Sequence, residues 1–510
     1  MADNRFSSTP VVFNKISFSG GLNTTAGPFA VGDTESTSLQ NVDFNIFGSV
    51  TKRGGYLHLT SAAIAAVNSD GLYWFEYETG GATVRKLVNV INGKLYKMDT
   101  SSGEPDGGWD DATNGRTITA DNFCDFATWH NTMFVANGEN TPLMLTGATL
   151  SLTTAVLPTN VTKPKYIEQF NNYLFYLNVY VSSAKEGSRF YWSDLNDHTT
   201  FSATAFIRVS DNDGTEITGS RVLSDRLVVF KDRSIYNVFY TADSQIPFIV
   251  EKSNSPVGCV SAYSIQEVQN GLVFLSQDGF YYYDGNNSYK LSDKISETIG
   301  AYVFSTARSA VHNLKNRYYC GLNDGAGAYT VLVWDFFNNA WSIYSGMTVS
   351  AMARSFKDGI DERTYFADIL GYAYQMDVAY NDYPAAVETA VDAYYYTNWK
   401  PMDDLVLQKG VPQVVVYHTI QEADLTFTYS YDFEEQDMYS ETINMLGGGM
   451  LWDVDDWDEG EWSKAGGKAK RMDLTGRGRV VRFGFKNSAV NETFRVDGLG
   501  LYVRGETHAG

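Results

Sequence analysis

Short apolar runs separated by turn-forming residues recur along most of this chain. The clearest case has two runs of β-branched and aromatic residues, Leu272–Leu275 and Phe280–Tyr283, on either side of Ser276-Gln277-Asp278-Gly279. An Asp-Gly pair between two such runs predicts a β-hairpin, because glycine tolerates the positive φ angle that a tight turn needs. A second turn pair, Asp284-Gly285, follows directly.

Variants of this hairpin return at intervals of roughly 40–50 residues along the chain. Each interval holds three or four short strands, which is the size of one blade of a β-propeller. A flat meander of this length would expose its edge strands, whereas radial closure protects them. We therefore predict an all-β fold with a β-propeller of six or seven blades at residues 65–382. An array of two-sheet sandwiches is the alternative.

The pattern changes after Asn381-Asp382-Tyr383-Pro384. The strand-like runs become longer, and several alternate between polar and apolar residues, as in a sheet with one solvated face. Residues 383–510 have the size of one β-sandwich, which we predict for this segment. Residues 1–64 are predicted to form an N-terminal arm and a strand, and this strand is a candidate to close the propeller.

Composition supports many short strands and argues against a nucleic-acid-binding protein. The 510 residues exceed one ordinary core, so two or three domains are expected. The formal net charge of −21 disfavours a grip on phosphates, which needs clustered Lys and Arg. An acidic surface suits solubility, and it also suits a surface past which DNA slides without sticking.

Cysteines and apolar segments indicate where the chain folds. Cys124, Cys259 and Cys320 lie far apart and are odd in number, which predicts reduced thiols and folding in a cytosol. The N-terminus has no apolar signal-peptide core, and no window of about 18 apolar residues occurs. We therefore predict neither a signal peptide nor a membrane span.

No local motif points to catalysis. The segment from Asp211 to Glu216 begins like a calcium loop, but an EF-hand needs Glu at its twelfth position, which is Val222 here. We interpret it as an acidic β-turn. Histidines at metal-ligand spacing, a nucleophile elbow and a phosphate-binding loop are all missing from the sequence. We assign no catalytic, cofactor-binding or metal residues, and predict a protein that is not an enzyme and has no cofactor.

Two segments are candidate interfaces. The loop from Trp452 to Trp462 combines six carboxylates with three indoles, and Trp452, Trp457 and Trp462 are candidate anchors for a partner. A solvated loop is the alternative, with a carbohydrate-active carboxylate cluster as a third reading. Lys52 and Arg53 are the second candidate interface, with solvated charge at a strand end as the alternative.

The two ends of the chain resemble structural proteins of tailed bacteriophages. The residues that carry the resemblance are Gly20-Gly21-Leu22-Asn23, Leu39–Phe44, Gly48–Val50, Lys52–Tyr56, the two hairpins at 92–99 and 277–285, and Phe494–Arg504. In overall plan the chain is most similar to the tail hub or nozzle protein of short-tailed phages, also described as the packaged-DNA stabilisation protein. The resemblance is specific in about the first 60 and the last 30 residues.

This resemblance implies a structural virion protein of the tail, made in the host cytoplasm. It implies a propeller and sandwich subunit, of which six copies form a ring below the portal and its adaptor protein. The ring would gate the DNA channel and carry tail fibres or a needle. Genomic DNA would pass through an acidic channel without specific binding.

The alternative is a tail-associated propeller protein that binds or hydrolyses glycans. It predicts that at least two carboxylates from different blades converge in one pocket. Asp211, Asp213 and Glu216 are then the first alanine targets. A metal-stabilised adhesin is a third hypothesis, which the failed calcium spacing disfavours.

Overall fold

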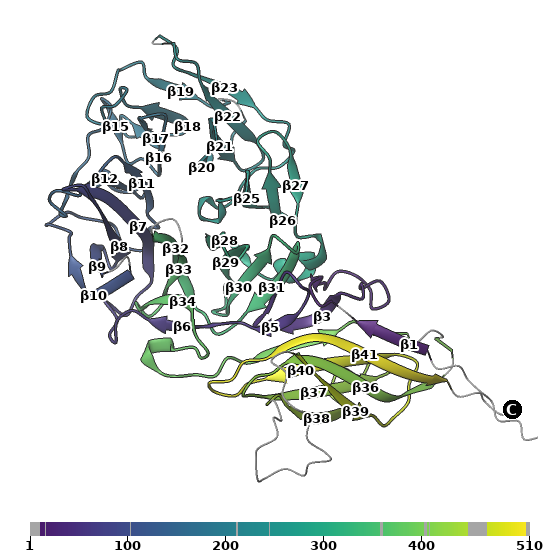
Figure 1. The fold of residues 1–510 in the computed structure, drawn as a ribbon. Helices are drawn as coiled ribbons and strands as arrows, with labels where there is room; N and C mark the ends of the chain where they lie inside the picture. Colours follow the sequence, from purple (N-terminus) through teal and green to yellow (C-terminus); the bar gives the residue numbers. More distant parts are fainter. Residues whose placement is uncertain are drawn as a thin grey trace, which may run out of the picture.

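Seven antiparallel sheets stand around a common axis in the part of the chain that the structure describes (Figure 1). The computed structural model describes residues 11–15, 17–101, 104–210, 213–243, 245–357, 361–401, 405–406, 408–446 and 467–505. Strands dominate this part, and its helices are single turns: η1 (Ala262–Ser264), η2 (Asp293–Ile295), α1 (Ser296–Ile299) and η3 (Pro384–Ala386). The predicted all-β class is confirmed.

The first four blades follow one another along the chain. Blade 1 contains β7 (Ser69–Thr79), β8 (Ala82–Ile91), β9 (Lys94–Ser101) and β10 (Glu104–Asp111). Blade 2 contains β11 (Asp125–Trp129), β12 (Thr132–Ala136), β13 (Leu143–Thr146) and β14 (Leu152–Thr154). Blade 3 contains β15 (Val161–Thr162), β16 (Tyr166–Phe170), β17 (Tyr173–Val181), β18 (Ala184–Trp192) and β19 (Phe206–Arg208). Blade 4 contains β20 (Ile217–Leu223), β21 (Arg226–Lys231), β22 (Ile235–Tyr240) and β23 (Phe248–Lys252).

The last three blades complete the ring. Blade 5 contains β24 (Gln266–Val268), β25 (Gly271–Ser276), β26 (Gly279–Tyr283) and β27 (Ser288–Lys290). Blade 6 contains β28 (Val303–His312), β29 (Arg317–Asn323), β30 (Tyr329–Asp335) and β31 (Ala340–Tyr344). Blade 7 contains β32 (Val349–Lys357), β33 (Asp361–Asp368), β34 (Ala373–Ala379) and, from the start of the chain, β6 (Gly55–His58).

The ring closes on its inside and on its outside. On the inside, β7, β11, β16, β20, β24, β28 and β32 each contact the next in this order, and β32 contacts β7. On the outside, β6 pairs with β34, with His58 opposite Tyr374 and Leu57 opposite Gln375. An N-terminal strand therefore supplies the outer edge of the last blade. Blade 7 is thus built from the beginning and the end of the propeller segment.

The hairpin turns form where the sequence predicts them. Ser276 pairs with Gly279, so Gln277 and Asp278 make a two-residue turn. Gly279 has a φ angle of 135°, and a Cβ atom there would lie 2.3 Å from Ser292 Oγ. This position needs glycine for its conformation and for space.

The sandwich is built from both ends of the chain. One sheet has the order β39 (Gly467–Asp473), β36 (Lys409–Thr419), β41 (Arg495–Gly505), β5 (Val50–Lys52) and β4 (Val42–Phe44), and β1 (Val11–Lys15) also pairs with β41. The other has the order β2 (Gly21–Leu22), β3 (Glu35–Gln40), β35 (Ala393–Thr397), β40 (Val481–Asn487), β37 (Asp424–Tyr431) and β38 (Tyr439–Asn444). The N-terminal segment is therefore not a separate arm: β1 to β5 belong to the sandwich and β6 to the propeller.

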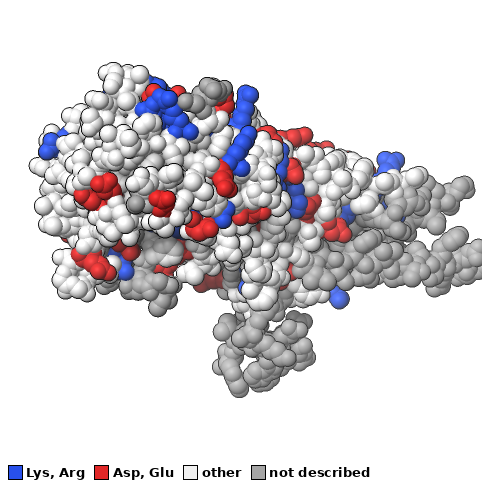
Figure 2. All heavy atoms as spheres, turned by 90° about the horizontal axis from the view of Figure 1, so that it is seen from above, with Lys and Arg blue, Asp and Glu red and all other residues white. Residues whose placement is uncertain are grey.

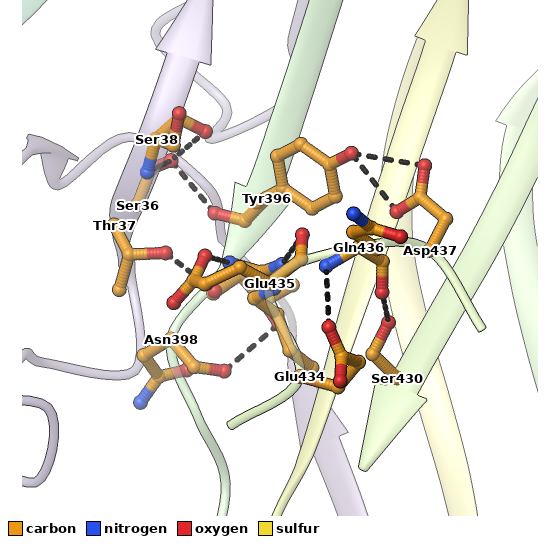
Figure 3. Close-up of polar contacts among 12 residues, drawn as sticks. Ser36, Thr37, Ser38, Tyr396, Asn398, Ser430, Glu434, Glu435, Gln436 and Asp437 are labelled. Carbon is orange, nitrogen blue, oxygen red and sulfur yellow. Dashed lines mark hydrogen bonds and ion pairs between the residues drawn. The ribbon is translucent and has the colours of Figure 1, made fainter. Parts of the chain in front are cut away.

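Polar contacts fasten this N-terminal segment to the C-terminal strands (Figure 3). Ser36 Oγ donates a 2.7 Å hydrogen bond to the Tyr396 carbonyl, and the Tyr396 hydroxyl donates to Asp437 Oδ1 at 2.9 Å. Behind them Arg482 lies 4.6 Å from the rings of both Tyr396 and Trp399 and donates to Glu435 Oε2 at 2.8 Å. Strands from opposite chain ends thus share one hydrogen-bonded layer.

The sandwich and the propeller share a hydrophobic core. One continuous cluster of buried residues includes Phe18 and Phe485 of the sandwich together with Phe280 and Trp341 of blades 5 and 6. The Trp341 indole also donates a 3.0 Å hydrogen bond to the Leu291 carbonyl. Burying this much apolar surface between the two units disfavours their independent movement.

A buried ion pair lies at the junction between the two units. Arg53 donates to both carboxylate oxygens of Asp382, at 2.8 and 2.6 Å, and its Nε donates to Asn41 Oδ1 at 2.8 Å. Arg53 Nη2 also reaches the Ser345 carbonyl of blade 6 at 3.1 Å. One guanidinium therefore ties the segment before β6, blade 6 and the linker after blade 7 together.

The sequence suggested that Lys52 and Arg53 are exposed, but the structure buries both residues. They are 3% and 2% exposed, and Lys52 Nζ donates to Asn487 Oδ1 at 2.8 Å. Their side chains satisfy groups inside this chain, so they are neither solvated charge nor a surface that a partner can contact. Consecutive Lys and Arg resemble surface residues in sequence because their partners lie hundreds of positions away.

Removing one member of the junction pair should destabilise the fold strongly. We expect Arg53→Ala to lower the free energy of unfolding by about 3–5 kcal/mol, because the Asp382 carboxylate is left buried without its partner. Chemical denaturation followed by tryptophan fluorescence measures the effect. The control is Lys94→Ala, which breaks an exposed 2.8 Å pair with Asp111 and should matter far less. Equal losses in the two variants would contradict the role assigned to Arg53.

Candidate functional site: the axial cavity of the propeller

A cavity of about 450 Å³ lies where the inner strands of the propeller meet. Its walls come from β7, β11, β20, β24, β28 and β32, with further residues from the segments just before β11 and β24. Ligand sites commonly have volumes of about 300–1,000 Å³ and form where several elements converge. Within the described residues this is the best-formed candidate for a binding site.

Three arginines from three blades line this cavity: Arg221 of β20, Arg308 of β28 and Arg354 of β32. Arg221 Nη1 lies 3.9 Å from Glu168 Oε2, and Arg354 Nη1 lies 3.9 Å from Glu362 Oε1. Arg308 donates to the carbonyls of Ala307 at 2.8 Å and Ser305 at 3.3 Å. Each guanidinium is held in place, but among the described residues none has a carboxylate closer than 3.9 Å.

Desolvation acts on these arginines. Burial lowers the pKa of Arg308 and of Arg354 from the ordinary arginine value. The Nε atoms of Arg221 and Arg308 are buried and have no hydrogen-bond partner. A buried donor without a partner costs roughly 1–3 kcal/mol, and more when the group is charged. The propeller therefore keeps charged side chains near its axis at a cost in folding free energy.

Carboxylates occupy the same region. Glu76, Asp125 and Glu267 line the cavity, and they come from blades 1, 2 and 5. Glu168 lies behind Arg221 on β16. Burial raises the pKa of Asp125 to about 6 and that of Glu168 to about 7, although the nearby Arg221 opposes both shifts.

Aromatic side chains form much of the remaining wall. The Arg308 guanidinium lies 4.0 Å from the Phe123 ring and 5.0 Å from the Tyr263 ring. The Tyr263 hydroxyl donates to the Phe123 carbonyl at 3.0 Å, which fixes this stack. Tyr73 and Trp74 line the cavity from β7, and both are only partly buried. The site thus combines positive charge, hydrogen-bond acceptors and partly open aromatic faces.

One repeated tripeptide in the sequence marks this site, although it belongs to no motif considered above. Ala-Arg-Ser occurs at 307–309 and again at 353–355, one blade interval apart. In both copies the alanine and the serine are buried, while the arginine is partly exposed to the cavity. A charged residue between small buried ones, repeated at the blade spacing, marks an inner strand that faces the axis.

The residues singled out from the sequence lie elsewhere. Lys52 and Arg53 are buried at the junction, and Trp452, Trp457 and Trp462 lie outside the described residues, as does Asp211. Asp213 accepts a 2.6 Å bond from Lys231, whose side chain is fully buried, and Glu216 pairs with Lys185 at 2.7 Å. Asp213 and Glu216 therefore do not face the axial cavity.

The described residues offer neither a metal site nor a reactive thiol. Among the described residues no three His, Cys, Asp or Glu side chains are grouped so that they hold a metal ion. Cys124, Cys259 and Cys320 are buried free cysteines, and burial raises the pKa of the Cys259 and Cys320 thiols to about 12. Thiols with such a high pKa are poor nucleophiles at neutral pH.

The raised pKa of Glu168 leads to a pH-dependent prediction. The folded state holds this proton more tightly than the unfolded state, so its contribution to stability falls as pH rises from about 4.5 to 7. Glutamine does not ionise, so Glu168→Gln should gain about 1–3 kcal/mol relative to the wild type between pH 5 and pH 8. Urea unfolding at both pH values measures this gain.

The control for that experiment is Glu251→Gln, which changes an exposed glutamate on β23 of the neighbouring blade. The gain with pH must be larger for Glu168→Gln than for this control. A gain of the same size in both variants would show that burial of Glu168 does not set the pH dependence.

A comparison with protein-family models matches most of the propeller to a known family. Residues 55–301 match the family model described as Bacteriophage P22 Gp10, beta-propeller. The matched segment begins at β6 and ends just before β28, so it covers the closing strand and blades 1 to 5. A comparison with curated protein sequences gives no match. No helix among the described residues is long and apolar enough to cross a membrane.

Two solved structures show distant likeness. One is the computationally designed Ika8 protein, with a TM-score of 0.38 and 13% identity over 62% of this chain and 98% of that one. The other is PorZ, a surface component of the type-IX secretion system of Porphyromonas gingivalis, with a TM-score of 0.38 and 13% identity over 71% of this chain. This chain spans 45% of the length of PorZ. The family match, together with the seven-bladed ring, supports a bacteriophage tail stabilisation protein with a β-propeller.

Proposed function

We propose that this protein is a structural subunit of a phage tail that assembles into a ring-shaped nozzle or hub. The observation that carries the proposal is the match of residues 55–301 to the P22 Gp10 propeller model. In this proposal six copies form the ring below the portal and its adaptor protein, gate the DNA channel, and carry tail fibres or a needle. The protein acts mechanically and is not an enzyme.

The connection between propeller and sandwich suits a part that bears load. The chain enters the sandwich, closes blade 7 with β6, completes the ring and returns to the sandwich. The Arg53–Asp382 pair and the shared core lock this path at the junction. A pull on one unit is therefore transmitted to the other through packed side chains and not through a flexible linker.

An exposed apolar patch next to this junction supports contact with a neighbouring copy. It consists of Ile46 and Phe47 in the β4–β5 turn, Leu314 in the β28–β29 turn and Phe337 in the β30–β31 turn, which are 56%, 77%, 62% and 58% exposed. Ile46, Leu314 and Phe337 line one shallow groove. Clustered apolar side chains on a soluble protein commonly mark a protein interface, and ring assembly requires such a surface on every copy.

The acidic excess of the chain underlies the proposed behaviour toward DNA. With a net charge of −21, a ring of several copies would repel phosphates rather than bind them. On the face shown in Figure 2, basic side chains gather in a few groups toward the upper edge of the view, and acidic side chains are scattered over the rest without forming one large patch. The repulsion therefore rests on the summed charge of the ring and would weaken as salt is added.

Mass photometry of the purified protein, alone and with portal–adaptor complex, tests the proposal. We expect a discrete ring of about six copies on the complex. The double variant Phe47→Ser/Phe337→Ser should weaken ring formation, since it removes two exposed apolar contacts. Leu195→Ser, which alters a 50% exposed leucine in the loop after β18, is the matched control. A chain that stays monomeric with the complex present would overturn the proposal.

The alternative, a glycan-binding or glycan-hydrolysing protein, draws on one specific observation. Glu76, Asp125 and Glu267 come from three different blades and line one cavity, which is the convergence that this alternative requires. The alanine targets suggested by sequence do not reach this cavity, so these three carboxylates replace them. Turnover of a bacterial glycan that stops in Glu76→Gln or Glu267→Gln would favour the alternative.

A further inference from the structure

We propose that the axial cavity binds a carboxylated sugar, of the uronic-acid class, with its carboxylate held by Arg221, Arg308 and Arg354. This proposal does not depend on the role of the protein in a phage tail, because it rests on the cavity alone. It is also a proposal of binding and includes no chemical step.

The anionic part of the ligand follows from the arginines. Three guanidiniums from separate blades line one cavity, and none has a carboxylate closer than 3.9 Å among the described residues. The side chains of Arg221 and Arg354 are 35% and 32% exposed, so both are accessible from the cavity that they line. A carboxylate supplies two acceptor oxygens that match the planar fork of an arginine.

The charge of the ligand follows from the acids in the same cavity. Glu76, Asp125 and Glu267 line the walls beside the three arginines, so the lining as a whole is close to neutral. A phosphate dianion would gain from the arginines but would be repelled by these carboxylates. A group with a single negative charge fits this balance better.

The neutral part of the ligand follows from the remaining lining. Tyr73, Trp74 and Tyr263 line the cavity and are partly buried, and each already packs on one neighbouring ring, Phe126, Tyr365 and Phe123 respectively. Glu267 also lines the cavity and is exposed. Sugar rings pack their C–H faces on aromatic side chains and donate hydroxyl protons to carboxylates. The cavity volume of about 450 Å³ is within the range of small-molecule sites.

Saturation-transfer-difference NMR on the full chain tests this proposal. D-glucuronate is titrated to about 20 mM, with D-glucose as the comparison ligand and inorganic phosphate as a competitor for the glucuronate signal. We expect a saturable signal for glucuronate and a much weaker one for glucose, which has the same ring without the carboxylate. Arg308→Gln and Arg354→Gln should each weaken glucuronate binding by about ten- to a hundredfold, since each removes one charge-assisted contact.

The matched control is Arg226→Gln. Arg226 lies in the same blade as Arg221, stacks on Phe239 at 4.7 Å and pairs with Asp225 at 2.8 Å, and it does not line the cavity. This variant should bind glucuronate as the wild type does. Arg354→Lys keeps the charge, covers the case in which a glutamine variant does not fold, and should bind with an intermediate affinity.

Three outcomes would overturn the proposal. Absence of a saturable glucuronate signal with the wild type over the whole titration would show that the cavity does not bind this sugar. Loss of the glucuronate signal on addition of an equal concentration of phosphate would show a general anion site and not a sugar site. Unchanged glucuronate affinity in folded Arg308→Gln and Arg354→Gln would place the ligand outside the axial cavity.

Discussion

The buried bidentate pair between Arg53 and Asp382 fixes the path of the chain between its two units. Arg53 follows the sandwich strand β5 and precedes β6, while Asp382 follows the last propeller strand β34. The pair therefore joins the points where the chain leaves the sandwich and returns to it. A charged pair at this depth is costly to desolvate, and it is tolerated because Asn41 and the Ser345 carbonyl satisfy further donors of the guanidinium. The geometry of the junction follows from these bonds.

Closure of the propeller depends on that junction. The outer edge of blade 7 is β6, which pairs with β34 and directly follows residues that are anchored in the sandwich. The inner edge closes separately, through the contact of β32 with β7. With both edges closed, the seven sheets expose short outer strands and surround an axis at which six of the seven inner strands contribute to one cavity. The site is thus a product of closure and not of any single blade.

Local features of the fold could be read from the sequence, and long-range ones could not. The turns at Gln277-Asp278 and Asn92-Gly93 follow from residue preferences within a few positions, and the structure has them. The pairing of β1 with β41 joins two strands from opposite ends of the chain. A local sequence pattern does not predict which distant strand will be the partner. For the same reason the sequence suggested that Lys52 and Arg53 are surface residues. In the structure they are buried, with Asn487 and Asp382 as their partners. Arg308 and Arg354 were missed because each stands alone in its strand, and only the closed ring brings them together.

The axial cavity and the family match concern different parts of the propeller. The matched segment ends at residue 301, so it includes Arg221 but neither Arg308 nor Arg354. What the match supports is a propeller of a phage tail stabilisation protein, and this says nothing about the side chains that blades 6 and 7 direct toward the axis. Burial lowers the pKa of Arg308 and Arg354, and the carboxylates paired with Arg221 and Arg354 lie as far as 3.9 Å away. Charged side chains at this place carry a free-energy cost that packing alone does not require, because an apolar lining would close the ring as well. An anionic ligand in the cavity that these arginines line gives this cost a function, and it does so whether or not the chain assembles into a ring.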